Sequence, residues 1–345
     1  VGFFVNNAAL DLAIVGEAPA AGGRKWVGIA GSISTLGVVG MPAGFALQVK
    51  DLQFFYNVAA SDGKRMDWKA LSGNGFGINL GALSLFDNSV EFKVAATIFV
   101  GIENFVYVSG SVALQRKDLF VKTVGSTTTT KMSMLTLGAS NLRAFAGTGN
   151  ADINADGVVD EVAVLAQNGV GVSVNIDNLA IVIAKPVPTS PSAPSTKSYF
   201  ALSGSGSASL VGVDDIQLGG RISIAINQGK DGALATPSID FAASATANSD
   251  SWGSTLGLKA PTGPANDQFV IVDFAESNLL KVAGYVTLSI ADFLHLSGQF
   301  AFSKSGAPMT VKIAGSTATK QVNVLTIGAS DVNAFVGIGG PYFQD

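Results

Sequence analysis

An acidic stretch at residues 152–160 has the spacing of oxygen donors that a calcium ion binds. Side-chain oxygens stand at the first, third, fifth and ninth positions and a backbone carbonyl at the seventh, supplied by Asp152, Asn154, Asp156, Asp160 and Val158. Gly157 occupies the sixth position, where such loops need a residue that accepts a sharp turn. These residues predict a calcium site, with a solvated turn that holds no ion as the alternative.

The stretch departs from a full EF-hand. The twelfth position is Ala163 where an EF-hand has a bidentate Glu, although Glu161 lies nearby, and no helical pattern flanks the loop. It resembles the shorter acidic calcium loops of dockerin-like and thrombospondin-like repeats. A calcium ion at this position is expected to stiffen the chain locally and to couple its folding to the calcium present outside cells.

Catalytic side chains are scarce. The chain has one histidine, His295, and no cysteine, so a Ser-His-Asp triad and the usual zinc sites are nearly excluded. Paired carboxylates remain, at Asp214-Asp215 or at Asp11 with Glu17. They leave a carboxylate-based glycosidase as a third-ranked alternative. The prediction is that the protein is not an enzyme and has no catalytic residues.

The chain contains an internal repeat. Residues 125–149 and 315–339 share 13 identities in 25 ungapped positions. Further matches join Lys93-Val94-Ala95 to Lys281-Val282-Ala283, Ser109-Gly110 to Ser297-Gly298, Val5-Asn6 to Val174-Asn175, and Leu12–Val15 to Leu179–Val182. His295 falls on Tyr107 in this alignment, which argues against a catalytic histidine. Self-similarity of this kind indicates a tandem array.

Two copies follow from these matches. Copy one spans residues 1–169 and ends in the acidic loop, and copy two spans residues 170–345. A Pro/Ser-rich segment at residues 186–196 is expected to be an exposed loop, since its prolines exclude a central strand. Because Val1 is no initiator Met and Asp345 matches the start of the acidic loop, we expect a segment of a longer repetitive protein, or one released by processing.

Alternating apolar and small residues predict strands throughout. Val286, Leu288 and Ile290 alternate with polar or small residues, and Phe99–Val108, Ser109–Leu114 and Leu119–Val124 are further predicted strands. Asp-Gly turns and 41 glycines favour antiparallel neighbours. The predicted fold is all-β, with two tandem copies of a largely antiparallel, meandering repeat that form an elongated sandwich-like or solenoid-like structure.

The composition indicates that much apolar surface is hidden from water. Hydrophobic residues make up 48% of the chain and charged residues 13%, with a mean hydropathy of +0.40. No run approaches the ~20 apolar residues of a spanning helix, so no membrane span is predicted. An outer-membrane barrel stays open as a low-ranked alternative. A net charge of −4 without a basic cluster predicts no nucleic-acid partner.

The repeat resembles a known group. The pattern at Ser297-Gly298-x-Phe300-Ala301-Phe302, Gly315-Ser316-Thr317 and Leu325-Thr326-x-Gly328-Ala329-Ser330 is similar to tandem repeats of very large, calcium-loop-containing bacterial surface or extracellular proteins. The resemblance implies export, a tandem architecture and a structural or adhesive role. We therefore predict an extracellular or cell-surface bacterial protein, a repeat unit of a filament, sheath or adhesin stalk.

Its expected partners are other copies of itself or neighbouring repeats, with a cell-surface or matrix ligand as a further possibility. The main alternative is a binding module whose sheet encloses a hydrophobic groove for lipid or another apolar ligand.

Overall fold

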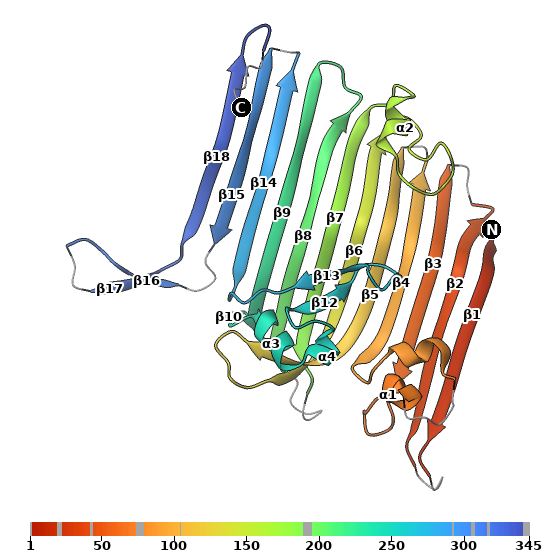
Figure 1. Ribbon diagram of the computed structural model, residues 1–345. Coiled ribbons are helices and arrows are strands. Elements are labelled where there is room, and N and C mark those ends of the chain that lie inside the picture. Colours follow the sequence, from red (N-terminus) through yellow and green to blue (C-terminus); the bar gives the residue numbers. More distant parts are fainter. Residues whose placement is uncertain are drawn as a thin grey trace.

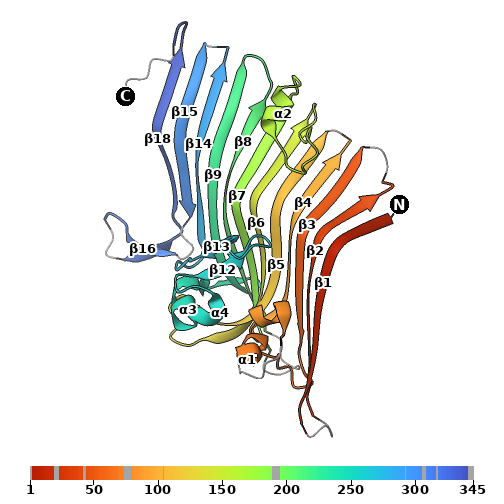
Figure 2. The same cartoon turned by 45° about the vertical axis from the view of Figure 1, so that its right-hand side comes forward.

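The computed structural model describes residues 2–18, 23–41, 44–73, 79–103, 105–188, 195–291, 293–304, 308–315 and 318–340. One large antiparallel β-sheet dominates this part of the chain (Figures 1 and 2). The prediction of an all-β, largely antiparallel fold is confirmed. Of the predicted Pro/Ser-rich loop at residues 186–196, residues 189–194 lie outside the described residues, and Pro186 is the last residue of β7. The predicted second acidic loop at Asp345 also lies outside them.

Strands that follow one another in sequence lie side by side in the sheet. Their order is β1 (Gly2–Gly16), β2 (Lys25–Val39), β3 (Phe45–Val58), β4 (Val90–Ile102), β5 (Val106–Thr123), β6 (Thr130–Gly147), β7 (Gly171–Pro186), β8 (Lys197–Val211), β9 (Ile216–Asp231), β14 (Leu279–Ile290), β15 (Leu294–Lys304) and β18 (Leu325–Val336). Each neighbouring pair is antiparallel. Among the described residues, β1 and β18 each pair with one strand only, so they are the two edges of an open sheet.

Shorter elements between these strands gather on one face of the sheet, which we call the covered face (Figures 1 and 2). They are α1 (Trp68–Gly73) and the 3-10 helix η1 (Gly81–Leu85) after β3, α2 (Glu161–Leu165) after β6, and β10 (Leu234–Thr236), β11 (Ile239–Asp240), α3 (Phe241–Ala247), α4 (Ser249–Trp252), β12 (Leu258–Pro261) and β13 (Phe269–Val272) after β9. A hairpin of β16 (Met309–Lys312) and β17 (Thr319–Val322) projects beyond the β18 edge (Figure 1).

Two tryptophans hold the larger inserts on the covered face. Trp68 of α1 is fully buried, and its indole Nε1 donates a hydrogen bond to Asn57 Oδ1 at 2.9 Å. Trp252 of α4 is also fully buried, and its Nε1 donates to the Phe120 carbonyl at 3.2 Å. A buried aromatic ring whose polar atom is satisfied stabilises a core strongly. Each insert is thereby fixed to a different part of the sheet.

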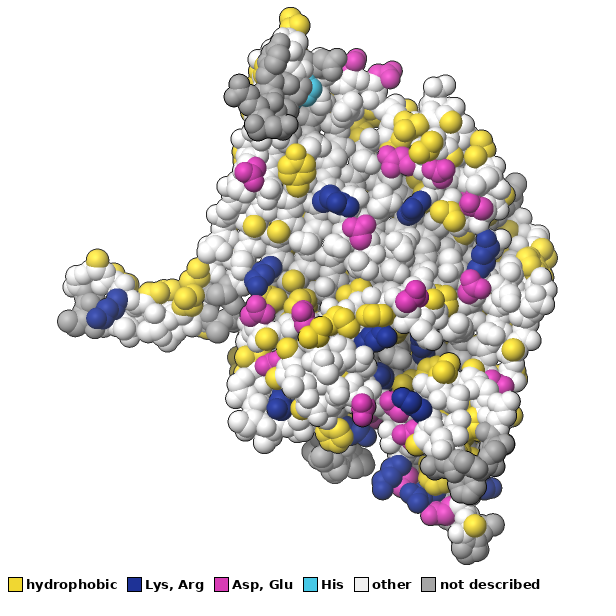
Figure 3. All heavy atoms as spheres, viewed as in Figure 1, with side chains coloured by type: hydrophobic (Ala, Val, Ile, Leu, Met, Phe, Trp, Pro, Cys, Tyr) yellow, Lys and Arg dark blue, Asp and Glu magenta, His cyan; other side chains and the backbone are white. Residues whose placement is uncertain are grey.

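The opposite side of the sheet, which we call the open face, carries apolar side chains from the same strands. Met132 and Met134 of β6 face the covered side and are buried, whereas Leu137 of the same strand faces the open side and is 41% exposed. Ile183 of β7 lies on the same side and is 44% exposed. Charged side chains of both signs are spread over the covered face (Figure 3). The open face also has charged residues near one end, since Arg116 and Asp118 of β5 lie opposite Leu135 and Ser133 of β6. The sheet thus carries apolar side chains on both sides, with inserts over only one of them.

Mid-strand irregularities recur at equivalent places in two hairpins. The register between β5 and β6 shifts at Ser109/Ser111, where Gly110 has a φ of 149° and Asn141 a φ of 50°. The register between β15 and β18 shifts at Ser297/Gln299, with Asp331 at a φ of 51°. Glycine and asparagine accept positive φ more readily than most residues, so these positions suit bulges.

Several predicted features differ from the structure. The predicted strand Phe99–Val108 spans the turn between β4 and β5, where the Phe105 N–H donates to the Ile102 carbonyl at 2.9 Å. The predicted strands Ser109–Leu114 and Leu119–Val124 are both parts of β5. The expected sandwich-like or solenoid-like arrangement is replaced, in the described residues, by one large open sheet, since inserts rather than a second large sheet cover one of its two faces.

The close approach of Trp68 to β2 gives a test of this packing. A Cβ added at Gly28 would lie 2.6 Å from two atoms of the Trp68 ring, so Gly28→Ala is expected to lower the free energy of unfolding by about 1–3 kcal/mol. Gly16→Ala is the matched control, because a Cβ there meets nothing within 4 Å. Urea unfolding followed by tryptophan fluorescence measures both, and equal effects would contradict the packing described here.

Candidate functional site

The acidic loop lies between the end of β6 and the start of α2, on the covered face (Figure 1). Gly157 has a φ of 79°, which a residue without a side chain adopts readily, and Ala155 before it has a φ of 55°. The backbone thus makes the sharp turn at the position that the spacing predicted. Asp152 is half-buried, whereas Asn154 and Asp156 are exposed.

Hydrogen bonds within the loop hold its side-chain oxygen atoms, the ones that would bind calcium, close to Gly157. The Gly157 N–H donates to Asp152 Oδ1 at 3.1 Å, and the Val158 N–H donates to Asp156 Oδ1 at 2.8 Å. Asn154 Nδ2 donates to Asp156 Oδ2 at 3.0 Å. Asp160 has a different role, because its Oδ1 accepts from the Val162 N–H at 2.9 Å and caps the start of α2.

Residues far away in the sequence attach this loop to the sheet. Lys50 Nζ of β3 donates to the Asp156 carbonyl at 2.7 Å, and Ser109 Oγ of β5 accepts from the Val159 N–H at 2.9 Å. Val159 and Val164 are buried in a small apolar cluster that Phe99, Tyr107, Ala151, Phe145 and Val211 complete. Burial raises the pKa of the Tyr107 phenol, and the nearby Asp152 carboxylate raises it further. The loop is therefore packed against the sheet.

Sequence reasoning missed Lys50 and Ser109 as anchors of the loop. They lie 106 and 50 residues before their partners, and no local pattern links them to the acidic stretch. Only the paired strands β3 to β6 bring them beneath it.

The residues of the loop fit calcium in part. Their donors are all oxygen, which is what calcium prefers, and Asp152, Asn154, Asp156 and the Val158 carbonyl are the residues that would hold the ion. Asp160 is engaged as a helix cap. Within the described ranges, no three His, Cys, Asp or Glu side chains lie together as a metal-binding group. Calcium at the loop therefore stays a prediction.

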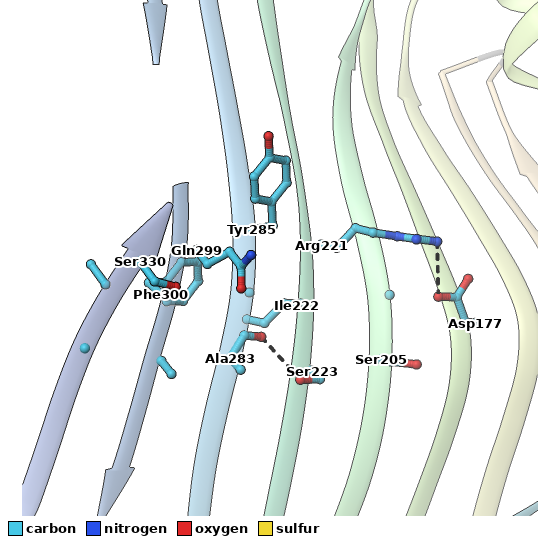
Figure 4. A pocket seen from close by; sticks show the side chains of 15 residues that line it. Asp177, Ser205, Arg221, Ile222, Ser223, Ala283, Tyr285, Gln299, Phe300 and Ser330 are labelled. Carbon is cyan, nitrogen blue, oxygen red and sulfur yellow. Dashed lines mark hydrogen bonds and ion pairs between the residues drawn. The ribbon is translucent and has the colours of Figure 1, made fainter. Parts of the chain in front are cut away.

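A shallow groove of about 660 Å³, lined by polar and apolar residues, crosses β7, β8, β9, β14, β15 and β18 on the covered face (Figure 4). Arg221 and Asp177 face each other across its floor, with 4.0 Å between Nη2 and Oδ2, and Ser223 Oγ donates to the Ala283 carbonyl at 3.3 Å. Both charged side chains are largely exposed, so their pairing contributes little. Among the described residues that line the groove, Asp177 is the one carboxylate, whereas a glycosidase uses two facing acids.

A second groove, of about 510 Å³, is lined by apolar side chains of the open face. Strands β7, β8, β9, β14 and β15 supply them, and the larger ones are Val172, Val174, Ile176, Leu179, Leu210, Leu218, Ile222, Ile224, Val286 and Phe300. Glycines at 204, 206, 219 and 220 leave the space that larger side chains would fill. This groove has the chemistry of a site for an apolar ligand.

The carboxylates considered for catalysis have structural partners. Asp11 Oδ2 accepts from the Ala82 N–H of η1 at 2.8 Å. Glu17 pairs with Arg24 at 2.9 Å, and the hydrogen bonds from Arg24 lower the pKa of Glu17 to about 2. Asp214 and Asp215 lie exposed in the turn between β8 and β9. These contacts are those of turns and surface ion pairs.

The single histidine is placed inside a strand pair. His295 of β15 lies opposite Phe335 of β18, and its Nδ1 is 3.0 Å from Ser289 Oγ of β14. Tyr107 lies opposite Phe145 in the same way in β5 and β6. His295 thus occupies a position that Tyr107 fills elsewhere in the sheet.

Comparison of the chain with protein-family models, with curated proteins and with solved structures found no match. None of the helices in the described residues is long and apolar enough to cross a membrane.

Calcium is expected to stabilise the protein through the acidic loop. An ion that binds only the folded state adds about 1.4 kcal/mol when free calcium is about tenfold above its Kd, so Tm is expected to rise with added calcium and to fall with EGTA. Asp152→Ala and Asp156→Ala are each expected to abolish this rise in Tm. Asp214→Ala, in an exposed turn elsewhere, should keep it. A Tm indifferent to calcium in the unmodified chain would rule out the site.

Proposed function

We propose that this chain is a structural repeat unit of an extracellular bacterial surface assembly, such as a filament, sheath or adhesin stalk, in which its sheet continues into neighbouring copies. The observation that carries the proposal is the single open sheet, apolar on its open face and ending in two exposed strands. The scarcity of charge in the composition agrees with this proposal, since the apolar side chains of each edge would be buried against the edge of a neighbouring copy.

The strand order supports a unit of six strands that occurs twice. Copy one supplies β1 to β6, and copy two supplies β7, β8, β9, β14, β15 and β18. In each set the covering insert follows the third strand, α1 and η1 after β3 and the α3–β13 region after β9. The pairs Tyr107/Phe145 and His295/Phe335 occupy matching places. These correspondences support the proposal that the chain holds two copies of one unit.

The first strands of the two copies match without an insertion. The offset of 169 residues that relates Val5 to Val174 also relates Leu10 to Leu179 and Ile14 to Ile183. This alignment replaces the match of Leu12–Val15 with Leu179–Val182, which needed a shift. With it, β1 corresponds to β7 along its whole length.

The two edge strands favour assembly of the chain over a monomeric state. Ile327 of β18 is 78% exposed, and Leu10, Leu12 and Ile14 of β1 are 66%, 60% and 68% exposed. Natural sheets usually protect such edges with charges, prolines or a covering loop. The described edges carry few such features, with Asp11 in β1 and Asp331 in β18 as their acidic residues. An edge of this kind is suited to pairing with another strand.

Calcium has a place in this proposal. The acidic loop connects β6, the last strand of copy one, to β7, the first strand of copy two. An ion held by Asp152, Asn154 and Asp156 would stiffen the connection between repeats, which suits a load-bearing stalk outside the cell.

The assembly is tested by negative-stain electron microscopy and sedimentation of the purified chain. Elongated polymers are expected, and EGTA should shorten or dissolve them. Ile327→Lys and Leu12→Lys place a charge on each edge and are each expected to reduce the sedimenting fraction. Leu256→Lys is the control, because Leu256 is 68% exposed but lies in an insert. A chain that stays monomeric at all concentrations would refute the proposal.

An apolar-ligand binding module is the second candidate, favoured by the 510 Å³ groove on the open face. A fatty acyl chain is of suitable chemistry for its lining. If this function is correct, organic extraction of the purified protein and mass spectrometry should detect a stoichiometric lipid, and Ile222→Asp in the groove should lose it. Leu256→Asp, outside the groove, should retain the lipid.

A further inference from the structure

We propose that β18 pairs with β1 of a second copy of this chain, antiparallel and in the same register in which β6 pairs with β7. This inference rests on the proposed function, because it assumes that the two sets of six strands are copies of one unit. The contact between β6 and β7 is then the junction between two units, already present within the chain. It serves as the template for the junction between chains.

The directions of the strands permit this contact. Neighbouring strands alternate in direction along the whole path from β1 to β18, and the path has an even number of strands. β1 and β18 therefore run in opposite directions. A second copy shifted sideways, without being turned over, brings its β1 beside β18 as an antiparallel neighbour. The covered faces of both copies then lie on the same side, and the open faces form one surface.

The register follows from the internal junction. Leu137 of β6 lies opposite Ile181 of β7, and Leu135 lies opposite Ile183. In the repeat, an offset of 190 residues aligns Leu137 with Ile327 of β18, and Leu135 with Leu325. An offset of 169 residues aligns Ile181 of β7 with Leu12 of β1, and Ile183 with Ile14. The predicted neighbours across the junction are thus Ile327 with Leu12, and Leu325 with Ile14.

The side chains that meet in this register are the exposed apolar ones of the two edges. Ile327 is 78% exposed and Leu12 60%, while Leu325 is 57% and Ile14 68% exposed. Their counterparts inside the sheet, Leu137 and Ile183, have strands on both sides and are 41% and 44% exposed. Apolar cross-strand pairs stabilise a sheet, and the pairing also satisfies the backbone groups along both edges. A second copy is therefore the complementary occupant of each edge.

Disulfide formation between designed cysteines tests the register. The chain contains no cysteine, so each pair can be introduced without interference. Cα atoms of residues opposite each other in antiparallel strands lie about 4.5–5.5 Å apart, within the range that a disulfide spans. Leu12→Cys with Ile327→Cys in one chain is expected to give a ladder of covalent multimers on oxidation. Those two positions are on opposite edges of one chain (Figure 1), so the bond must join two copies.

Two matched variants control the experiment. Leu137→Cys with Ile181→Cys reproduces the internal junction and should give a disulfide within one chain. Val5→Cys with Ile327→Cys moves one cysteine about 23 Å along β1 and is expected to give about tenfold less multimer than the matched pair.

The outcomes separate this inference from the proposed function. Polymers in the microscope without the Leu12/Ile327 cross-link would overturn the register and leave the assembly standing. Strong dimers from Ile327→Cys alone would show β18 against β18 and would also overturn it. Monomers in the microscope together with no cross-link would overturn both. A covalent ladder confined to the matched pair is the result that supports the inference.

Discussion

Backbone hydrogen bonding between neighbouring strands is the constraint on which this structure depends. Each strand between β1 and β18 pairs its N–H and C=O groups with the strands on both sides of it, and an antiparallel order of sequence neighbours is the simplest way to do so. The pattern has no internal stopping point. It ends where a strand lacks a neighbour, and in the described residues this happens at β1 and at β18. The function proposed for the chain follows from these two ends.

The second constraint is the need to cover apolar side chains on both sides of the sheet. On the covered face the inserts meet this need, with Trp68 and Trp252 as their buried anchors and small residues such as Gly28 beneath them. The open face has no such layer among the described elements and retains half-exposed leucine, isoleucine and valine. A sheet of this kind combines a well-packed side, which gives stability, with a half-exposed apolar side and two edges that are unpaired in the described residues.

The sequence predicts the presence of most strands, but it predicts their ends and their arrangement in one open sheet less well. Alternation at Val286, Leu288 and Ile290 correctly indicates β14, because these residues share the open face. The turn within Phe99–Val108 is missed, since apolar residues continue through the hairpin on both sides of it. The single strand β5 is divided in the prediction because four consecutive polar residues, Gln115 to Asp118, interrupt the alternation of apolar side chains. The sequences of the two inserts have no long stretch of helical periodicity from which a covering layer could be predicted.

For the candidate site, the spacing of acidic residues predicts the turn at Gly157 but not the role of Asp160 as a helix cap or the support from Lys50. Those depend on elements formed elsewhere in the chain.

The two edge strands, β1 and β18, differ from each other in sequence. Objects assembled by joining unlike edges are polar, like a row of arrows, so their two tips are chemically distinct. A molecule that recognises only the β18 tip would arrest elongation there while the other tip went on growing.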